Sequence, residues 1–287
     1  MMIEWTLLLA TGSLSADDWT QYRGSGRDAV WREEGLLETF PPEGLKIRWR
    51  VPAAGGFSSP VIAQGRVYLC DSVYHPAKAR ERIRSFDEKT GAVRWTYDYE
   101  VNYDEYWHQP KMVDGVRATP VVRDGRLYSA GADGDLACLD AVTGALVWKK
   151  KLVAEYGLTD HRTCTPSPLV EGDLLIVVIG GKPEACVVAF EKETGKEAWR
   201  ALGDRWTYSS PIVVEAGGKR QLRLVNPGYS YLCSNDPRVH FGLGAVQRID
   251  EIHVVWPDGS EETFPGGDVD RLLTLRRGEG RSEKASK

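Results

Sequence analysis

The stretch LDAVTGALVW, residues 139–148, occurs three times in slightly different forms. FDEKTGAVRW fills residues 86–95, and FEKETGKEAW fills residues 190–199. The tryptophans that close the three copies are 53 and 51 residues apart, and Trp49 precedes the first of them by 46 residues. A period of about 50 residues indicates stacked supersecondary units, as in a propeller or a solenoid.

A second signature lies upstream in each repeat. It consists of apolar stretches interrupted by a glycine-containing turn: SSPVIAQGRVYL from 58, ATPVVRDGRLYS from 118, PSPLVEGDLLIVV from 166 and SSPIVVEAGGKRQLRLV from 209. Each predicts a β-hairpin. The later TG pair predicts a second hairpin, because glycine supplies the positive φ that such turns require. Four short antiparallel strands per unit make the blade of a β-propeller.

The repeat resembles the tryptophan-docking motif of the PQQ-like β-propeller family, which includes propellers of the BamB type and quinoprotein dehydrogenases. The pattern D-x-x-TG-x-x-x-W stands at 87–95 and 140–148, and Glu191 replaces the aspartate in the third copy. The resemblance implies an all-β partial propeller of about three and a half blades over 17–228. It also implies that certain tryptophans pack as wedges between neighbouring blades, namely Trp49, Trp95, Trp148 and Trp199.

The repeat stops after the first hairpin of a fourth blade, and residues 229–279 follow a different pattern. NDPRVHFGLG at 235–244, IDEIHVVWPDG at 249–259 and LLTLRRGEG from 272 resemble the ASPIC/UnbV module, a small β domain without an implied catalytic role. We expect strands at 251–256 and 272–277, a turn at 257–259 and a disordered charged tail at 280–287. Polar residues in the first motif are expected to anchor turns and strands: Asp236, Arg238 and His240.

Composition excludes two classes of function. The 37 Lys and Arg against 41 Asp and Glu give a net charge of −4, which argues against a nucleic-acid partner. The longest apolar run is far shorter than the roughly 20 residues of a membrane span. The five cysteines form no C-x-x-C pair, so we expect no zinc site. We expect buried thiols, and long-range disulfides in an oxidising compartment are the alternative. The cysteines are Cys70, Cys138, Cys164, Cys186 and Cys233.

The N-terminal residues 1–16 have an apolar stretch followed by small residues, which resembles a secretory signal. Glu4 stands where a signal has a positive charge, so a ragged start is the equal alternative. The first interpretation, together with the family resemblance, predicts a periplasmic or secreted protein.

Three stretches lead from one blade into the next and are the best candidates for a binding face: DEYWHQP at 104–110, DHRTCTP at 160–166 and DRWTYSSP at 204–211. Loops in this position open onto one end of the propeller channel. Their candidate residues are Tyr106, Trp107, His108, His161, Arg162, Trp206 and Tyr208. For any single one, blade-specific packing is the stronger interpretation. No catalytic group is assigned, because no nucleophile lies beside an orienting partner.

Quinoprotein dehydrogenases hold PQQ beside a calcium ion and commonly have adjacent cysteines, and this sequence has no two adjacent cysteines. The acidic stretch 131–140 lacks the spacing of a calcium loop and is interpreted as a solvated turn. We therefore expect no metal site and no cofactor, and a scaffold that binds a protein or a small ligand on its propeller face. The alternative is a PQQ-dependent alcohol oxidoreductase using PQQ with calcium.

The number of blades raises one more expectation. Propellers of this family have seven or eight blades, so an open arc of three and a half would expose a strand edge, through which chains could self-associate. A four-bladed ring closed by LKIRWRV, residues 45–51, is the alternative.

Overall fold

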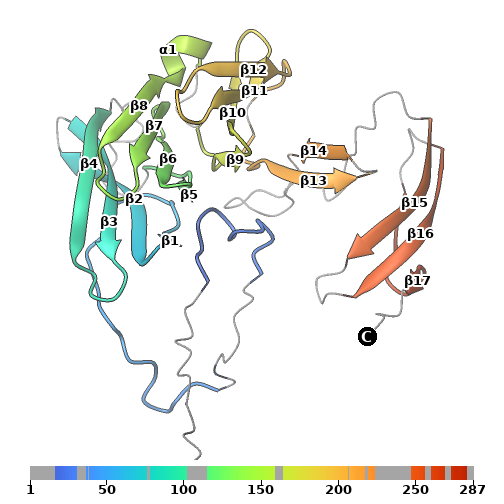
Figure 1. Ribbon diagram of the computed structural model, residues 1–287, viewed down its shortest axis with the longest axis horizontal. Coiled ribbons are helices and arrows are strands. Elements are labelled where there is room, and N and C mark those ends of the chain that lie inside the picture. Colours follow the sequence, from blue (N-terminus) through green and yellow to red (C-terminus); the bar gives the residue numbers. More distant parts are fainter. Residues whose placement is uncertain are drawn as a thin grey trace, which may run out of the picture. The chain divides into compact units, whose positions relative to one another are not determined.

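The computed structural model describes residues 17–30, 37, 39–75, 78–101, 115–158, 164–205, 207–216, 219–223, 247–255, 260–268 and 273–282. The chain divides into two compact units, residues 1–237 and 238–287. Nearly all of the regular secondary structure in their described parts is β-strand (Figure 1). The predicted domain boundary between 228 and 229 stays a prediction.

The first unit contains three complete blades, each a four-stranded antiparallel sheet whose strands follow in chain order. The first blade consists of β1 (Val61–Ala63), β2 (Arg66–His75), β3 (Lys78–Asp87) and β4 (Val93–Val101). The second consists of β5 (Val121–Arg123), β6 (Arg126–Ala130), β7 (Asp135–Asp140) and β8 (Leu146–Lys151). The third consists of β9 (Leu169–Glu171), β10 (Leu174–Gly181), β11 (Ala185–Glu191) and β12 (Glu197–Ala201).

A short helix, α1 (Leu152–Tyr156), follows the second blade. Among the described residues, the fourth blade contains one hairpin, β13 (Ile212–Ala216) and β14 (Lys219–Arg223), which forms a two-stranded sheet. The predicted all-β partial propeller is therefore confirmed.

The first turn of a blade follows directly from two letters of the sequence. Gln64 and Gly65 join β1 to β2 and both have positive φ, as do Asp124 and Gly125 between β5 and β6. Two successive residues in this region make the tight hairpin turn whose twist matches that of the flanking strands. The hairpins predicted from QG and DG form for this reason.

The hydrophobic core lies between the faces of neighbouring blades. Tyr68 and Ile83 of the first blade pack in one cluster with Leu127 and Leu139 of the second, and all four side chains are buried. A second cluster joins the second and third blades in the same way. Each blade therefore depends on the next one to bury its apolar face.

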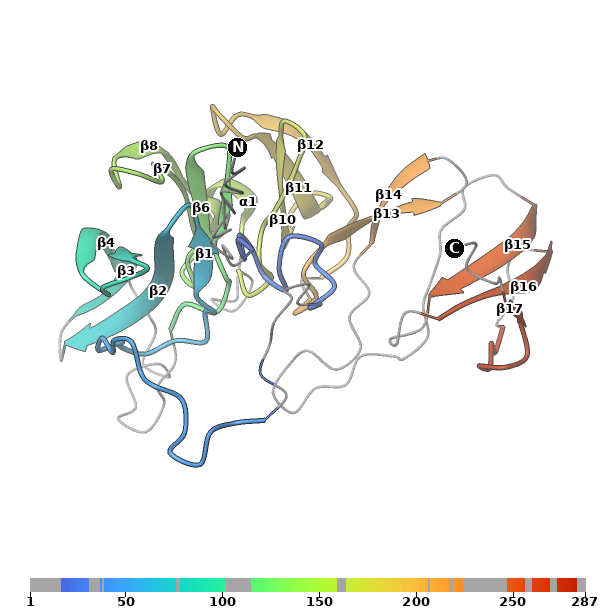
Figure 2. The ribbon, with the colours of Figure 1, turned by 60° about the horizontal axis from the view of Figure 1, so that its bottom comes forward.

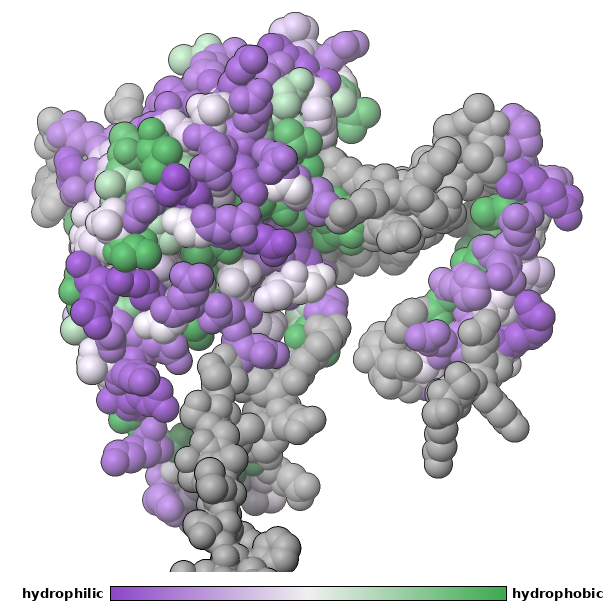
Figure 3. Space-filling model, in the orientation of Figure 1, coloured by the Kyte–Doolittle hydropathy of each residue, from purple (hydrophilic) through white to green (hydrophobic). Residues whose placement is uncertain are grey.

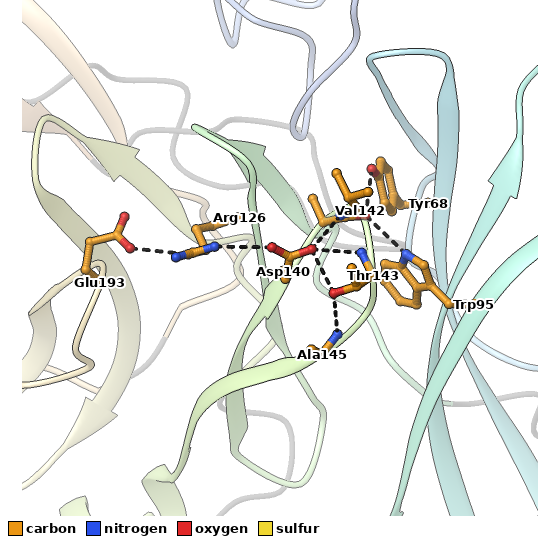
Figure 4. A network of polar contacts seen from close by, with 9 residues as sticks. Tyr68, Trp95, Arg126, Asp140, Val142, Thr143, Ala145 and Glu193 are labelled. Carbon is orange, nitrogen blue, oxygen red and sulfur yellow. Dashed lines mark hydrogen bonds and ion pairs between the residues drawn. The ribbon is translucent and has the colours of Figure 1, made fainter.

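The tryptophan on the outer strand of a blade stabilises the interface by contacting a turn of the next blade. The Trp95 indole N–H of β4 donates to the Ala141 carbonyl oxygen at 3.1 Å, beside the bond from the Tyr68 hydroxyl to the same oxygen (Figure 4). The indole ring lies against Gly144, where a methyl group would come within 2.6 Å of a ring carbon. Equivalent contacts repeat twice more, from Trp49 to Gly91 and the Glu88 carbonyl, and from Trp148 to Gly195 and the Lys192 carbonyl.

The aspartate of the motif shapes the turn that receives the indole. In the second blade, Asp140 Oδ1 accepts hydrogen bonds from the Val142 and Thr143 amides and from the Thr143 hydroxyl. Asp140 also pairs with Arg126, which reaches on to Glu193 of the third blade (Figure 4). The aspartate and the TG pair of the motif thus belong to one turn, and the glycine of this turn offers a flat backbone surface to the indole.

The last wedge of the repeat is different. Trp199 on β12 is 36% exposed, and its blade is followed by the fourth hairpin, which has no TG turn in its sequence. Among the described residues no glycine turn receives this indole in the way that Gly195 receives Trp148.

The second unit is a three-stranded antiparallel sheet of β15 (Arg248–Val255), β16 (Glu261–Asp268) and β17 (Arg281–Ser282). The predicted strand at 251–256 is confirmed for its described residues, whereas the strand predicted at 272–277 is wrong, because residues 273–277 are irregular. The tail at 280–287, which was predicted to be disordered, differs as well, because Arg281 and Ser282 pair with β16. The turn predicted at 257–259 and the motif residues Asp236, Arg238 and His240 lie outside the described residues.

The surface and interior agree with the composition. The face drawn in Figure 3 is largely hydrophilic, with separate apolar patches. Cys70, Cys138 and Cys186 are buried thiols, and burial raises the pKa of Cys70 and Cys138 to about 12. Cys233 lies outside the described residues. No helix within the described parts of the chain is long and apolar enough to cross a membrane.

Replacing the receiving glycine tests the wedge directly. Gly125 and Gly144 have φ of +74° and +76°, but a methyl group meets nothing within 4 Å at Gly125 and meets the Trp95 ring at Gly144. We expect Gly125→Ala to lower the free energy of unfolding by about 1–2 kcal/mol through backbone strain. Gly144→Ala should cost about 1–3 kcal/mol more because of the ring contact. Urea unfolding of both variants measures this, and equal losses would contradict the wedge.

Truncating the tryptophans gives an independent check. Trp148→Ala removes an indole that is packed on Gly195 and should cost about 3–5 kcal/mol of unfolding free energy. Trp199→Ala serves as the control, because this side chain is more exposed and should cost about 1–2 kcal/mol. A Trp199 variant as unstable as the Trp148 variant would show that both residues are wedges.

Candidate functional site

The innermost strand of each of the four blades is directly preceded by a serine or threonine and a proline, and the hydroxyls of these serines and threonines connect the blades. The Ser59 amide donates to Thr119 Oγ1 at 3.1 Å, the Thr119 amide to Ser167 Oγ at 2.9 Å, and the Ser167 amide to Ser210 Oγ at 2.9 Å. We call these four residues the hydroxyl ladder. It lies along the inner edges of the blades, where a propeller has its axis.

Proline explains why the ladder forms at this place. A residue before proline is restricted to extended conformations. The proline itself has no N–H, so it cannot use up a neighbouring acceptor. The residue before it therefore keeps its own amide and hydroxyl for contacts with the adjacent blades. The sequence shows the signal as SSP, ATP, PSP and SSP, but only the structure shows that the four copies are bonded to each other.

The N-terminal segment, residues 17–30, lies against the same inner edges. The Ile62 amide of β1 donates to the Trp19 carbonyl at 2.9 Å, and the Val122 amide of β5 donates to the Thr20 carbonyl at 2.8 Å. Figures 1 and 2 both show this segment, in dark blue, between β1 and β13. It therefore covers the free edges of two inner strands that would otherwise face the axis.

Arg27 extends this contact to the other two blades. Its guanidinium is buried and donates to the Pro168 carbonyl at 2.6 Å and to the Pro211 carbonyl. Desolvation lowers the Arg27 pKa to about 10. Its Nε is buried without a hydrogen-bond partner. One segment thus joins the inner edges of all four blades through backbone groups and a single cation, and sequence reasoning did not identify it.

Only one of the seven predicted channel-face residues is described by the structure. Tyr208 is half-buried and lies in the chain two residues before Ser210 of the hydroxyl ladder. The other six fall on residues whose placement is outside the described part: Tyr106, Trp107, His108, His161, Arg162 and Trp206. In the order of the chain, the three candidate stretches lie between β4 and β5, between α1 and β9, and between β12 and β13.

Two aspartates of the acidic stretch 131–140 make ion pairs with lysines. Asp135 accepts from Lys149 and Lys151 at 2.8 Å each, and Asp133 accepts from Lys151 at 2.8 Å. Glu81 is buried, with the Tyr99 hydroxyl donating to it at 2.6 Å and the Ala132 amide at 2.9 Å. Within the described residues, no three His, Cys, Asp or Glu side chains come together closely enough to hold a metal ion.

Two family profiles match the chain. Residues 21–104 and 79–222 match the profile described as outer membrane protein assembly factor BamB, and residues 205–282 match ASPIC and UnbV. The chain belongs to the BamB family of PQQ-like propellers. In this BamB-family protein, the predicted ASPIC/UnbV module follows the propeller part.

Curated relatives of this BamB-family chain are oxidoreductases. Alcohol dehydrogenase (quinone), dehydrogenase subunit, from Gluconacetobacter polyoxogenes is 29% identical over 67% of this chain and 27% of its own length. Quinohemoprotein alcohol dehydrogenase from Comamonas testosteroni is 28% identical over 59% and 23%. The crystal structure of the Comamonas testosteroni enzyme aligns with 51% of this chain and 21% of its own at 25% identity, with a TM-score of 0.37. The chain spans about a quarter of the length of these curated relatives.

These relatives correct one expectation and shift another. The expectation that no cofactor is involved is wrong, because the names of the relatives point to a quinone. They also favour the alcohol-oxidoreductase alternative over a scaffold without catalysis. The reason for the error is physical. The blade motif packs the blades in scaffolds and in oxidoreductases alike, so it does not distinguish the two. The lack of two adjacent cysteines is not sufficient to exclude a cofactor.

The hydroxyl ladder can be tested at its middle member. Ser167→Ala would leave the buried Thr119 amide without its acceptor and should lower the free energy of unfolding by about 1–3 kcal/mol. Ser167→Thr keeps the hydroxyl, and threonine already occupies the equivalent position 119, so this control should lose less. Urea unfolding compares the two, and identical losses would speak against the hydrogen bond as the cause.

Proposed function

We propose that this chain contributes to the quinone-dependent oxidation of an alcohol. The observation that carries the proposal is the similarity of its propeller part to quinone alcohol dehydrogenases from several bacteria. The shared blades supply a wall around the axis. A bound quinone would supply the electron acceptor for this oxidation.

The described residues do not by themselves fit a quinone with calcium. They lack a cluster of metal ligands, and the Arg27 guanidinium, the buried cation at the axis, donates to backbone carbonyls. We therefore derive no reaction step through the cofactor from the described geometry.

The candidate channel-face residues have the chemistry that such a ligand requires. PQQ is a flat aromatic molecule with several carboxylates, so aromatic faces and cations would hold it. We propose that Tyr106, Trp107, His108, His161, Arg162, Trp206 and Tyr208 form this binding face. Arg162 would pair with a carboxylate, and the aromatic rings would stack against the flat ligand.

Cofactor retention is the test of this function. Purified chain incubated with PQQ and calcium should keep quinone absorbance through gel filtration and reduce a dye when a primary alcohol is added. Arg162→Ala should weaken PQQ binding about tenfold, the equivalent of one lost carboxylate pair. Arg123→Ala is the matched control, because Arg123 is exposed beside the β5–β6 turn, the other end of the inner strand. Absence of retained quinone at saturating PQQ would overturn the proposal.

A binding scaffold is the second candidate, and the match to the BamB profile over most of the propeller part supports it. It would use the same face for a protein or another small ligand. The cofactor experiment separates the two, since a scaffold retains no quinone and reduces no dye. In both cases we propose a periplasmic or secreted location, with 17–228 as propeller and 229–279 as the attached module.

A further inference from the structure

Residues 45–51, which we call the basic segment, have the sequence of a β-strand but pair with no strand in the described part of the chain. LKIRWRV alternates apolar and basic residues, so an extended backbone would place the two kinds on opposite sides. Lys46, Arg48 and Arg50 are exposed, and none forms an ion pair with another described residue. Ile47 is 62% exposed. The basic segment therefore presents backbone groups, apolar side chains and positive charge to solvent.

The first blade holds the basic segment near its C-terminal end. The Trp49 indole N–H donates to the Glu88 carbonyl at 2.7 Å, and its ring lies on Gly91. Just beyond the segment, Arg84 donates to the Pro52 carbonyl at 3.1 Å. A segment that is already held in this way loses less conformational freedom when a partner binds to it.

The complete blades show which residues pair with a strand that carries such a tryptophan. In each of them, the outer strand with the tryptophan pairs antiparallel with the third strand of its own blade. Directly opposite the tryptophan, this third strand has a small residue, namely Ser85, Cys138 or Ala189. A small residue leaves room for the indole, because the Cβ atoms of directly opposed residues are only about 5 Å apart.

The residues around the small one follow a pattern as well. The residue after it is large and apolar, and it pairs with the position two before the tryptophan. The residue two before it is also apolar, and it pairs with the position two after the tryptophan. The members are Phe86, Leu139 and Phe190 in the first case and Ile83, Leu136 and Val187 in the second. All six are buried, so both positions belong to the core.

The same pairing applied to the basic segment describes a complementary strand. Trp49 would face a small residue, Ile47 a large apolar residue and Val51 an apolar residue. Charge decides the remaining position, which faces Arg50. Because Arg50 is exposed and has no ion pair among the described residues, an acidic residue opposite it would be attracted, and a basic one would be repelled.

A second copy of the basic segment does not have this pattern. Directly opposed residues in an antiparallel pair lie on the same face, so a register that aligns the two apolar sides also places basic residues opposite basic residues. Like charges in this position destabilise the pair. The apolar side also offers only Leu, Ile, Trp and Val, so it has no small residue to face Trp49. Charge and size therefore both favour a different protein as the partner.

We propose that the basic segment is the docking site for an extended segment of another protein, which adds to it as an antiparallel β-strand. In chain order, the partner's segment has an apolar, an acidic, a small and a large apolar residue, which face Val51, Arg50, Trp49 and Ile47. Hydrogen bonds between the two backbones supply affinity, and the facing side chains supply specificity, as in other cases of strand addition. The proposal does not depend on the quinone chemistry proposed above.

Fluorescence anisotropy with labelled peptides tests the proposal on the full chain. The probe is ERIESFDE, which copies residues 81–88 with Arg84→Glu and contains the proposed order as I-E-S-F. It should bind about tenfold more tightly than ERIRSFDE, the unchanged copy, because that peptide places arginine opposite Arg50. ERIEWFDE, which also carries Ser85→Trp, should bind about tenfold more weakly than the probe, since an indole would meet Trp49. Equal binding of the three peptides, or none at about 1 mM, would overturn the proposal.

Two variants of the chain test the register of the added strand. Arg50→Glu should weaken binding of ERIESFDE about tenfold and strengthen binding of ERIRSFDE, because the charges are exchanged. Arg48→Glu is the matched control. Arg48 precedes Trp49 as Arg94 precedes Trp95, and Arg94 lies at a bulge where it pairs with no residue of β3. The control should therefore lose about threefold or less. Equal losses in both variants would show attraction of charge without strand pairing and would contradict the proposal.

Hydrogen exchange identifies the other occupants of the basic segment. In the free chain, the amides of residues 45–51 should exchange rapidly, and ERIESFDE should protect them. Protection in the free chain that does not change when the peptide is added would overturn the proposal, because the segment would then be paired within the chain or with a second copy.

Discussion

The propeller depends on the contact between a tryptophan and the glycine of the next blade. The contact needs a flat backbone surface, and the turn at Gly91, Gly144 or Gly195 offers it only because the glycine has no side chain and has a positive φ. It also needs a carbonyl for the indole N–H, which the same turn supplies. One four-residue turn thus satisfies the packing and the polar requirement of a large aromatic side chain. The ten-letter stretch repeats because each interface makes the same demands.

The inner edge of the blades uses a different device. There, hydroxyl groups and a buried arginine replace aromatic packing, because backbone amides and carbonyls of the inner strands have no fifth strand to pair with. The hydroxyl ladder bonds amides at the starts of these strands, and residues 17–30 bond others along them. Arg27 serves carbonyls of two blades with one guanidinium. Two kinds of contact therefore hold neighbouring blades in register: the tryptophan–glycine contact at the outer strands and the polar contacts at the inner strands.

The sequence was a good guide wherever structure arises from neighbouring letters. Turns and alternation within about ten residues predict the hairpins at 64–65 and 124–125, the four-stranded blades and the hairpin of the fourth unit. The ladder and Arg27 were missed because their partners are 43 to 184 residues away. The strand expected at 272–277 failed because apolar alternation there has no partner strand among the described residues. Serine or threonine before proline in four repeats was the signal that could have revealed the ladder.

The same physics explains why repeats identify the fold more readily than the chemistry. Residues that recur in every copy are those that every interface requires, so they carry packing and report nothing about a ligand. Ligand chemistry must come from the positions where the copies differ. In this chain those are the stretches between blades, where DEYWHQP, DHRTCTP and DRWTYSSP share little beyond a leading aspartate and a closing proline. Two histidines, two arginines and several aromatic rings are concentrated in them. These connections between the blades are therefore where we propose a function specific to this propeller.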